Sequence, residues 1–253
     1  MSVSEQLLEI FKHGVSSVQP NNILDNFIKV KSKKIIVTEG SKQKIYSKIN
    51  RVFPVCIGKA SVDMAKKIKK IFKVSNFKIE KGILIVNKEN FSKVKGFKCF
   101  SSGHPIPNRN GLDASIFLEN YLGKLEKNDL VLIFISGGGS ALAPYPVDGI
   151  SLEEKIIINK ILLESGANIK EINIVRKHLS KLKGGNLVKI CNPAYVHSFI
   201  LSDVIGDDLS SIASGMTTYD NSTFRDVKKI LNKYKIWTKI PKNIKNHINN
   251  GEK

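Results

Sequence analysis

The chain has 253 residues, of which 42% are hydrophobic, so it can bury a core and intrinsic disorder is not predicted. Its formal net charge is +19, but only four of its 41 basic residues are arginine and the lysines are spread along the chain, so no specific nucleic-acid interface is indicated. The three cysteines are far apart in the chain and form no CxxC pair, which argues against a zinc site and a disulfide framework. The sequence shows no signal peptide and no apolar run long enough to span a membrane, so we expect a cytoplasmic protein.

The first half of the chain alternates between predicted helices and strands. Two helices are predicted first, at residues 3–18 and 21–30. The segments that follow are a strand at 33–40, a strand at 51–57 that runs into a tight loop, a helix at 62–72, a strand at 82–87, a strand from 97 that ends in a loop rich in Gly, Pro and Asn, and a helix at 112–125.

The second half continues the alternation. An apolar strand from Leu130 leads into the sequence SGGGS. A helix at 151–167 has a capping box, formed by Ser151 and Glu154, and a glycine stop. The remaining predicted elements are a helix at 170–184, a strand at 195–203, a helix at 223–234 and a basic tail at 241–253.

Strands that alternate with helices predict a three-layer α/β/α, Rossmann-like domain with a mostly parallel sheet. The strands are almost continuously apolar, as is typical of parallel strands covered on both faces. Ligands of such folds bind at the carboxyl ends of the strands. We therefore expect four loops to converge at one edge of the sheet: 58–61, 102–105, 136–140 and 202–203.

The glycine loop, Ser136-Gly137-Gly138-Gly139-Ser140, follows the strand from Leu130. It is not a Walker A loop, because no GKS or GKT closes it. Consecutive glycines free backbone N–H groups to point at one anion, and the flanking hydroxyls add donors, so we favour a phosphate- or carboxylate-binding loop. The alternative is a tight turn without a ligand.

Three cations are candidates for binding or catalysis. Lys59 lies where a strand gives way to a helix, and both its ammonium and the helix N-terminus attract anions. Arg176 and Lys183 flank one side of the apolar stripe predicted for the helix at 170–184, whereas Lys177 is expected to point away. Solvated or snorkelling side chains are the alternative for each of them.

Two carboxylates are candidates for metal binding. Asp203 lies at a predicted strand end and Asp207 follows a glycine, and Mg²⁺ takes one or two carboxylates together with phosphates. The alternative is that both aspartates cap turns.

Several of these stretches together resemble one family. IGKAS, GHPIPNRNG, DLVLIFISGGGSAL, EINIVRKHLSKLKGGNL and LSDVIGDDLSSIASG occur in the order found in the N-terminal, DUF4147-type domain of the class II glycerate kinases, and the likeness spans residues 3–251. Met216 and Tyr219 stand where the family commonly has proline. The family's second domain, MOFRL, has no counterpart in the 253 residues, so the resemblance assigns residues 1–240 to the first domain and 241–253 to the domain boundary.

The resemblance implies ATP-dependent phosphorylation of D-glycerate, mostly to 2-phosphoglycerate, with Mg²⁺ as the metal. The glycine loop would hold phosphate oxygens, Lys59 would neutralise charge on the transferred group, Arg176 would grip a carboxylate or phosphate, and Asp203 with Asp207 would hold Mg²⁺. A hydroxypyruvate reductase and a non-catalytic domain that binds small anions stay open as alternatives. A separate MOFRL chain and a second copy of this chain are the partners left open.

Overall fold

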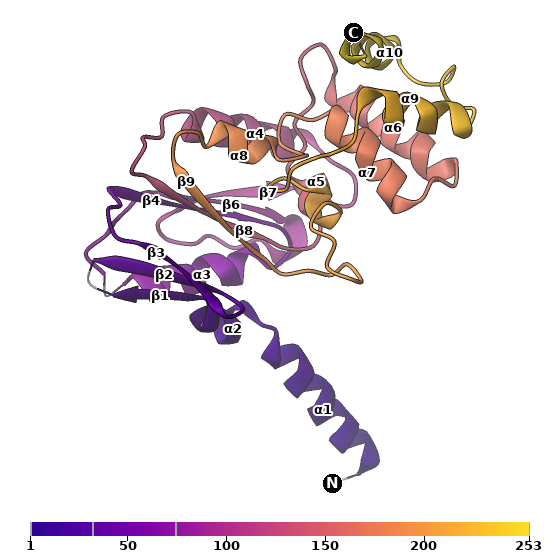
Figure 1. Cartoon of the computed structure of the whole chain (residues 1–253). Helices are drawn as coiled ribbons and strands as arrows, with labels where there is room; N and C mark the ends of the chain where they lie inside the picture. The colour runs from indigo at the N-terminus through magenta and orange to yellow at the C-terminus, as the bar shows by residue number, and fades with distance from the viewer. Residues whose placement is uncertain (1, 32, 74, 253) are drawn as a thin grey trace.

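A six-stranded sheet forms the centre of the computed structural model, which describes residues 2–31, 33–73 and 75–252 (Figure 1). The strand order is β7-β6-β4-β8-β9, with the short β5 beside β4, and every pair in this sheet is parallel. The strands are β4 (Arg51–Ile57), β5 (Lys78–Ile79), β6 (Gly82–Asn87), β7 (Phe97–Ser102), β8 (Leu130–Ile135) and β9 (Tyr195–Ile200). The mostly parallel sheet of the predicted fold is confirmed.

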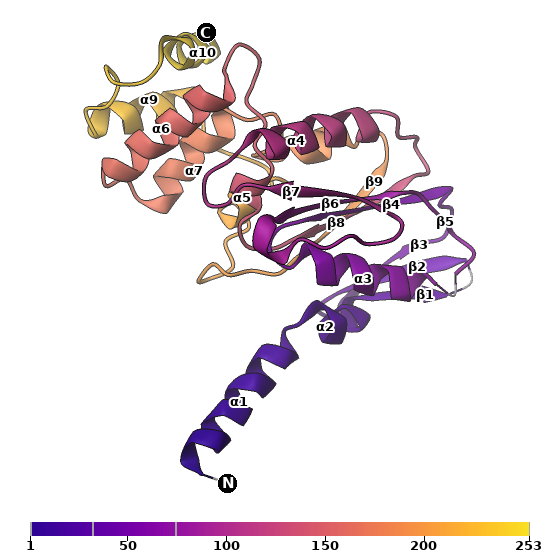
Figure 2. The same ribbon diagram turned by 180° about the vertical axis from the view of Figure 1, so that it is seen from behind.

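The two faces of the sheet are covered by different elements. Helix α3 (Ser61–Phe72) lies on one face, and α4 (Arg109–Leu122) with α8 (Asn186–Ile190) lies on the other (Figure 2). Successive β8 residues alternate between the two sides: Leu132 packs toward α3, and Ile133 toward α4. Because both faces are buried, both sets of β8 side chains are apolar, which explains the continuous apolar run in the sequence.

A small antiparallel sheet extends the layer that contains α3. It is formed by β1 (Ile28–Lys31), β2 (Lys34–Glu39) and β3 (Lys42–Tyr46). The predicted helix at 21–30 is therefore too long, since α2 (Pro20–Phe27) ends where Ile28 turns extended to pair with Val37. Helix α1 (Val3–Ser17) has no buried residue and projects from the rest of the chain (Figures 1 and 2).

Four further helices form a separate lobe beside the sheet (Figure 1). They are α6 (Leu152–Glu164), α7 (Ile169–His178), α9 (Phe224–Lys233) and α10 (Lys242–Gly251). The segment 241–253 is thus not a tail in its described part, because Ile244 and Ile248 are fully buried against the other helices of the lobe. No helix in the described ranges is both long enough and apolar enough to span a bilayer.

Helix α7 is shorter than the helix predicted at 170–184. It ends at His178, and the Ser180 hydroxyl then accepts backbone hydrogen bonds from Leu182 and Lys183. A serine side chain that hydrogen-bonds to nearby backbone groups competes with the backbone hydrogen bonds of a helix. The apolar residues that were predicted to form one face of this helix are still buried. Lys183, however, lies in the turn after the helix instead of in the helix itself.

Candidate functional site

The site lies at the edge of the sheet where the chain stops adding strands on one side of β4 and begins to add them on the other side. From β4 the chain passes through α3 to β6 on one side, whereas β8 and β9 lie on the other side of β4. The ends of β4 and β8 are in register at Ile57 and Ile135, and the Lys59 amide donates to the Gly137 carbonyl at 2.9 Å. In open α/β sheets the crevice beyond such a reversal is the usual ligand site.

A cavity of about 630 Å³ opens beside this edge, between the sheet and the helical lobe. We call it the central cavity. Its walls come from the glycine loop, the 104–107 loop, α6, α7 and the segment 203–214. Six of the residues singled out in the sequence line it: Gly137, Gly138, Ser140, Arg176, Lys183 and Asp203.

Gly138 is the left-handed residue of the glycine loop. Its φ of +84° is in the left-handed region, where glycine is favoured over other residues. A Cβ at this position would stand 2.9 Å from His104 Cδ2 and 3.3 Å from Lys59 Cε. Lys59, which is exposed, therefore lies beside the glycine loop although it does not itself line the cavity. Burial and the charge of Lys59 both lower the pKa of His104, which lines the cavity.

Ser136 and Gly139 do not line the cavity, in contrast to the prediction for the whole loop. The buried Ser136 hydroxyl accepts a 3.0 Å hydrogen bond from the Ala60 amide and so joins the loops after β8 and β4. Gly139 is buried beside Ala213, whose methyl would be 3.0 Å from an added Cβ. Both residues shape the loop and leave Gly137, Gly138 and Ser140 to face the cavity.

Three cations meet in the wall of the cavity without a negatively charged partner. Lys155 and Lys183 are 3% and 1% exposed, and Arg176 is partly buried. Their hydrogen-bond acceptors are neutral: the Leu179 carbonyl for Lys155, the Asn159 amide for Arg176, and the Ser140 and Ala143 carbonyls for Lys183. Within the described ranges, none of the three forms an ion pair with a carboxylate.

The mutual effect of these cations appears in their pKa values. Burial, together with the charge of Arg176, lowers the pKa of Lys183 to about 7. Burial, then Lys183 and Arg176, lowers the pKa of Lys155 well below its ordinary value. Cations buried this way without a counter-ion are costly, and an anion bound in the cavity would offset that cost.

Lys155 is a cavity residue that the sequence analysis did not identify. It lies on the buried face of α6, in line with Leu152, Ile158 and Leu162. A lysine three residues from apolar positions on either side in a largely apolar helix is the signal that could have found it, because lysine is rarely buried without a partner.

The two metal candidates are separated by the structure. Asp203 lines the cavity, and its carboxylate occupies the space that a side chain on Gly137 would need. Asp207 is exposed, has a φ of +51° and does not line the cavity, so the structure does not bring it together with Asp203 at the cavity wall. No group of three or more His, Cys, Asp or Glu side chains suited to a metal occurs in the described residues. Asp203 alone fits Mg²⁺ only with phosphates as further ligands, an arrangement that Mg²⁺ commonly takes.

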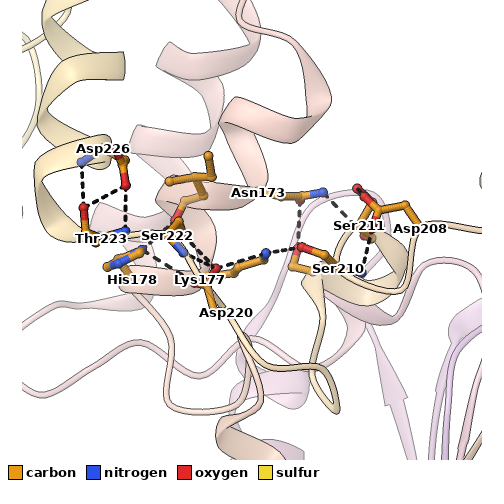
Figure 3. Close-up of polar contacts among 12 residues, drawn as sticks. Asn173, Lys177, His178, Asp208, Ser210, Ser211, Asp220, Ser222, Thr223 and Asp226 are labelled. Atoms are coloured by element: carbon orange, nitrogen blue, oxygen red, sulfur yellow. Dashed lines mark hydrogen bonds and ion pairs between the residues drawn. The ribbon is translucent and has the colours of Figure 1, made fainter.

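A polar network holds the segment 208–226 against α7 (Figure 3). Lys177 is buried and contacts both Ser210 and Asp220, with 3.4 Å between its Nζ and the Asp220 carboxylate. The expectation that Lys177 points away from the protein is therefore wrong. Asp220 also accepts hydrogen bonds from Ser222, and Asp208 caps the turn at Ser210 and Ser211. Unlike Lys155 and Lys183, Lys177 has an anionic partner.

A second set of contacts links α7 to the glycine loop. The Asn173 amide oxygen accepts from the Ser214 hydroxyl at 2.9 Å, and the Ser214 and Ser140 hydroxyls lie 2.9 Å apart. Ala213 and Ser214 have φ values of +50° and +56°, which are rare for residues with a Cβ. Backbone held in such conformations is concentrated at functional sites, because the surrounding packing must enforce it.

Comparison with known proteins yields one family and several relatives. The family described as domain of unknown function DUF4147 matches residues 6–249. The chain is 39% identical to the glycerate 2-kinase of Pyrococcus horikoshii over 251 residues, which cover 99% of the chain and 55% of the relative. It superimposes on the crystal structure of a glycerate kinase from Thermotoga maritima with a TM-score of 0.82 at 35% identity, covering 96% of the chain and 54% of that protein.

One relative has a different name. A putative hydroxypyruvate reductase of Agrobacterium vitis is 35% identical over 188 residues, which cover 74% of the chain and 48% of that protein. In each of these alignments the chain spans about half the length of the protein that it matches.

Proposed function

The chain belongs to the DUF4147 family, and from this membership we propose that it takes part in the ATP-dependent phosphorylation of D-glycerate, with 2-phosphoglycerate as the product. The observation that carries the proposal is the central cavity, where buried cations without counter-ions adjoin a glycine loop at the reversal point of a parallel sheet. Its relatives named glycerate kinase support the choice of substrate.

Phosphoryl transfer depends on positioning and charge neutralisation more than on covalent chemistry, and the residues present suit that requirement. Gly137 and Gly138 offer backbone next to the cavity, and Ser140 lines the cavity beside them. Lys59, beside Gly138, would neutralise charge that develops on the transferred group. Arg176 keeps its two terminal nitrogens free of the Asn159 contact and would grip a carboxylate or phosphate in two-point fashion.

Mg²⁺ would be held by Asp203 together with phosphate oxygens, and it would neutralise charge on the phosphates when bound. Asp207 is not proposed as a ligand of the same ion, because it lies outside the cavity wall. We place the protein in the cytoplasm on the basis of its cysteines, Cys56, Cys99 and Cys191, which are all free thiols.

The half of the relatives that this chain does not match is proposed to supply the second wall of the active site. Exclusion of water and groups on both sides of the reacting phosphate favour transfer, whereas a single wall leaves the charges screened by solvent. We therefore expect binding of anions by the 253 residues alone, but slow turnover until the second half is added.

The proposal is tested by ADP release from ATP, Mg²⁺ and D-glycerate, measured with the chain alone and with the unmatched half of the Pyrococcus horikoshii relative added. Lys59→Met should lower the rate by about 10²-fold or more, whereas Lys66→Met, an exposed lysine on α3, should leave it unchanged. NAD(P)H oxidation with hydroxypyruvate but no ADP release would favour the reductase, a name carried by one relative. Anion binding with neither reaction would favour a non-catalytic binding domain.

A further inference from the structure

The burial and polarity of the cavity wall change along one face of α6. Lys155, Asn159 and Leu163 follow one another at a spacing of four residues and all line the cavity. Lys155 is buried, Asn159 is partly buried, and Leu163 is 62% exposed. The face therefore runs from a cationic, buried end to an apolar end at the surface.

The buried end has more groups that can carry a positive charge than one small acid can neutralise. Lys155, Arg176 and Lys183, which we call the cation floor, are three cations with only neutral hydrogen-bond partners. Lys155 has three N–H donors and one acceptor, the Leu179 carbonyl at 2.9 Å, so two donors are left for a ligand. D-Glycerate has a single carboxylate, whereas a polyphosphate presents several charged oxygens in a row.

The open end has the opposite character. Ile106, Leu163 and Ile169 line the cavity and are 66%, 62% and 56% exposed. Exposed apolar side chains grouped around a cavity mark a surface that a flat apolar group can cover. Lys155 and Leu163 are eight residues apart, or about 12 Å along the helix at about 1.5 Å per residue, which is longer than a three-carbon acid.

We propose that the cation floor binds the polyphosphate chain of the nucleotide, with the base against Ile106, Leu163 and Ile169. This inference rests on the proposed kinase function and assigns the larger substrate of that reaction to the central cavity. The Lys59 side of the glycine loop is then left for D-glycerate, because Lys59 lies beside Gly138 but outside the cavity wall.

The test compares binding of tripolyphosphate, ATP and D-glycerate to the full chain by calorimetry, without Mg²⁺. Lys155→Met should weaken tripolyphosphate and ATP by at least about tenfold, because a charge-assisted hydrogen bond is lost, and should change D-glycerate affinity by less than about twofold. Lys229→Met removes the same charge from the exposed surface of α9 and should leave all three affinities unchanged. ATP should bind more tightly than tripolyphosphate, and Leu163→Ser should remove that difference.

Thermal melts accompany each titration, and Arg176→Gln replaces Lys155→Met if the latter does not fold. Loss of D-glycerate binding with polyphosphate binding retained would overturn the assignment and place the acid on the cation floor. Failure of the folded wild-type chain to bind tripolyphosphate would overturn it too. These outcomes are independent of turnover: a chain that binds ATP through Lys155 but releases no ADP even with the unmatched half of the Pyrococcus horikoshii relative added would contradict the kinase function and leave the polyphosphate site standing.

Discussion

The carboxylate of Asp203 lies directly against the backbone of Gly137, so that these two residues from the ends of neighbouring strands β9 and β8 meet at the wall of the central cavity. A negative side chain next to an anion-binding loop repels a phosphate unless a cation lies between them. The contact therefore gives Asp203 opposite effects on anion binding with and without Mg²⁺.

Asp203→Asn should show both effects. Without Mg²⁺ the substitution should strengthen binding of tripolyphosphate several-fold, because a repulsive charge is removed. With ATP present, the Mg²⁺ concentration needed for half-maximal binding should rise several-fold, because a ligand is lost. Asp207→Asn is the matched control, since Asp207 is exposed and outside the cavity wall. An unchanged Mg²⁺ titration for Asp203→Asn would return Asp203 to the role of a turn cap.

Gly138→Ala should abolish anion binding while the fold survives. The new Cβ would press on His104 and Lys59, and a left-handed backbone costs a non-glycine residue about 1–2 kcal/mol. Gly149→Ala separates these two effects, because Gly149 has nearly the same φ, +81°, with no atom within 4 Å of an added Cβ. In urea unfolding Gly149→Ala should lose only the stability that the left-handed backbone costs, Gly138→Ala should lose at least as much, and Gly138→Ala alone should fail to bind tripolyphosphate. Normal binding by Gly138→Ala would contradict the role given to the loop.

Binding and stability should respond to pH in opposite directions. The pKa of Lys183 falls from 10.5 in the unfolded chain to about 7 in the folded chain. Between these values the unfolded chain holds a proton that the folded chain has lost, so the free energy of unfolding rises with pH. Anion binding requires the charged lysine, so affinity falls as pH rises above about 7, toward about tenfold per pH unit. Lys155 should affect the free energy of unfolding and the anion affinity in the same directions as Lys183, because burial also lowers the pKa of Lys155.

Sulfate is the probe for this prediction, because its charge is constant between pH 6.5 and 9. The other titratable groups that line the cavity are His104, Asp203 and Glu164, with Lys160 and Arg176. Burial and the charge of Lys59 lower the pKa of His104 below its ordinary 6.5. Lys183→Met should reduce the slope of both pH profiles, with the contribution of Lys155 remaining. Parallel profiles for binding and stability in the wild-type chain would show that Lys183 does not contact the anion.

Much of the sheet could be predicted because its signal is local. The apolar run at 130–135 and the loops that follow the strands indicated both the parallel sheet and the edge where Gly138 and Asp203 lie. The antiparallel strand at Ile28 could not be predicted from its own residues, since it depends on pairing with Val37 across a turn. Lys155 and Lys177 look alike in the sequence. Only tertiary contacts show that Lys177 has an anionic partner and that Lys155 does not.

The contrast between Lys155 and Lys177 gives the last prediction. Lys177→Met removes the lysine cation from a buried ion pair and leaves Asp220 with the Ser222 donors and with the His178 ring 3.9 Å away, so the free energy of unfolding should fall by about 3 kcal/mol. Lys155→Met leaves no carboxylate behind and removes an unpaired buried charge, at the loss of one hydrogen bond to Leu179, so the free energy of unfolding should rise by about 1–2 kcal/mol.

Both changes are measured by urea unfolding at pH 7 in a buffer without multivalent anions, since a bound anion stabilises the wild-type chain and hides the effect. Adding tripolyphosphate should then reverse the order, because wild type gains stability from the ligand and Lys155→Met gains little. If Lys155→Met instead lowers the free energy of unfolding as much as Lys177→Met does, the role of the Lys155 ammonium is to stabilise the end of α7 by its hydrogen bond to the Leu179 carbonyl. The cation floor would then lack the member that distinguishes a polyphosphate site from a site for a single carboxylate.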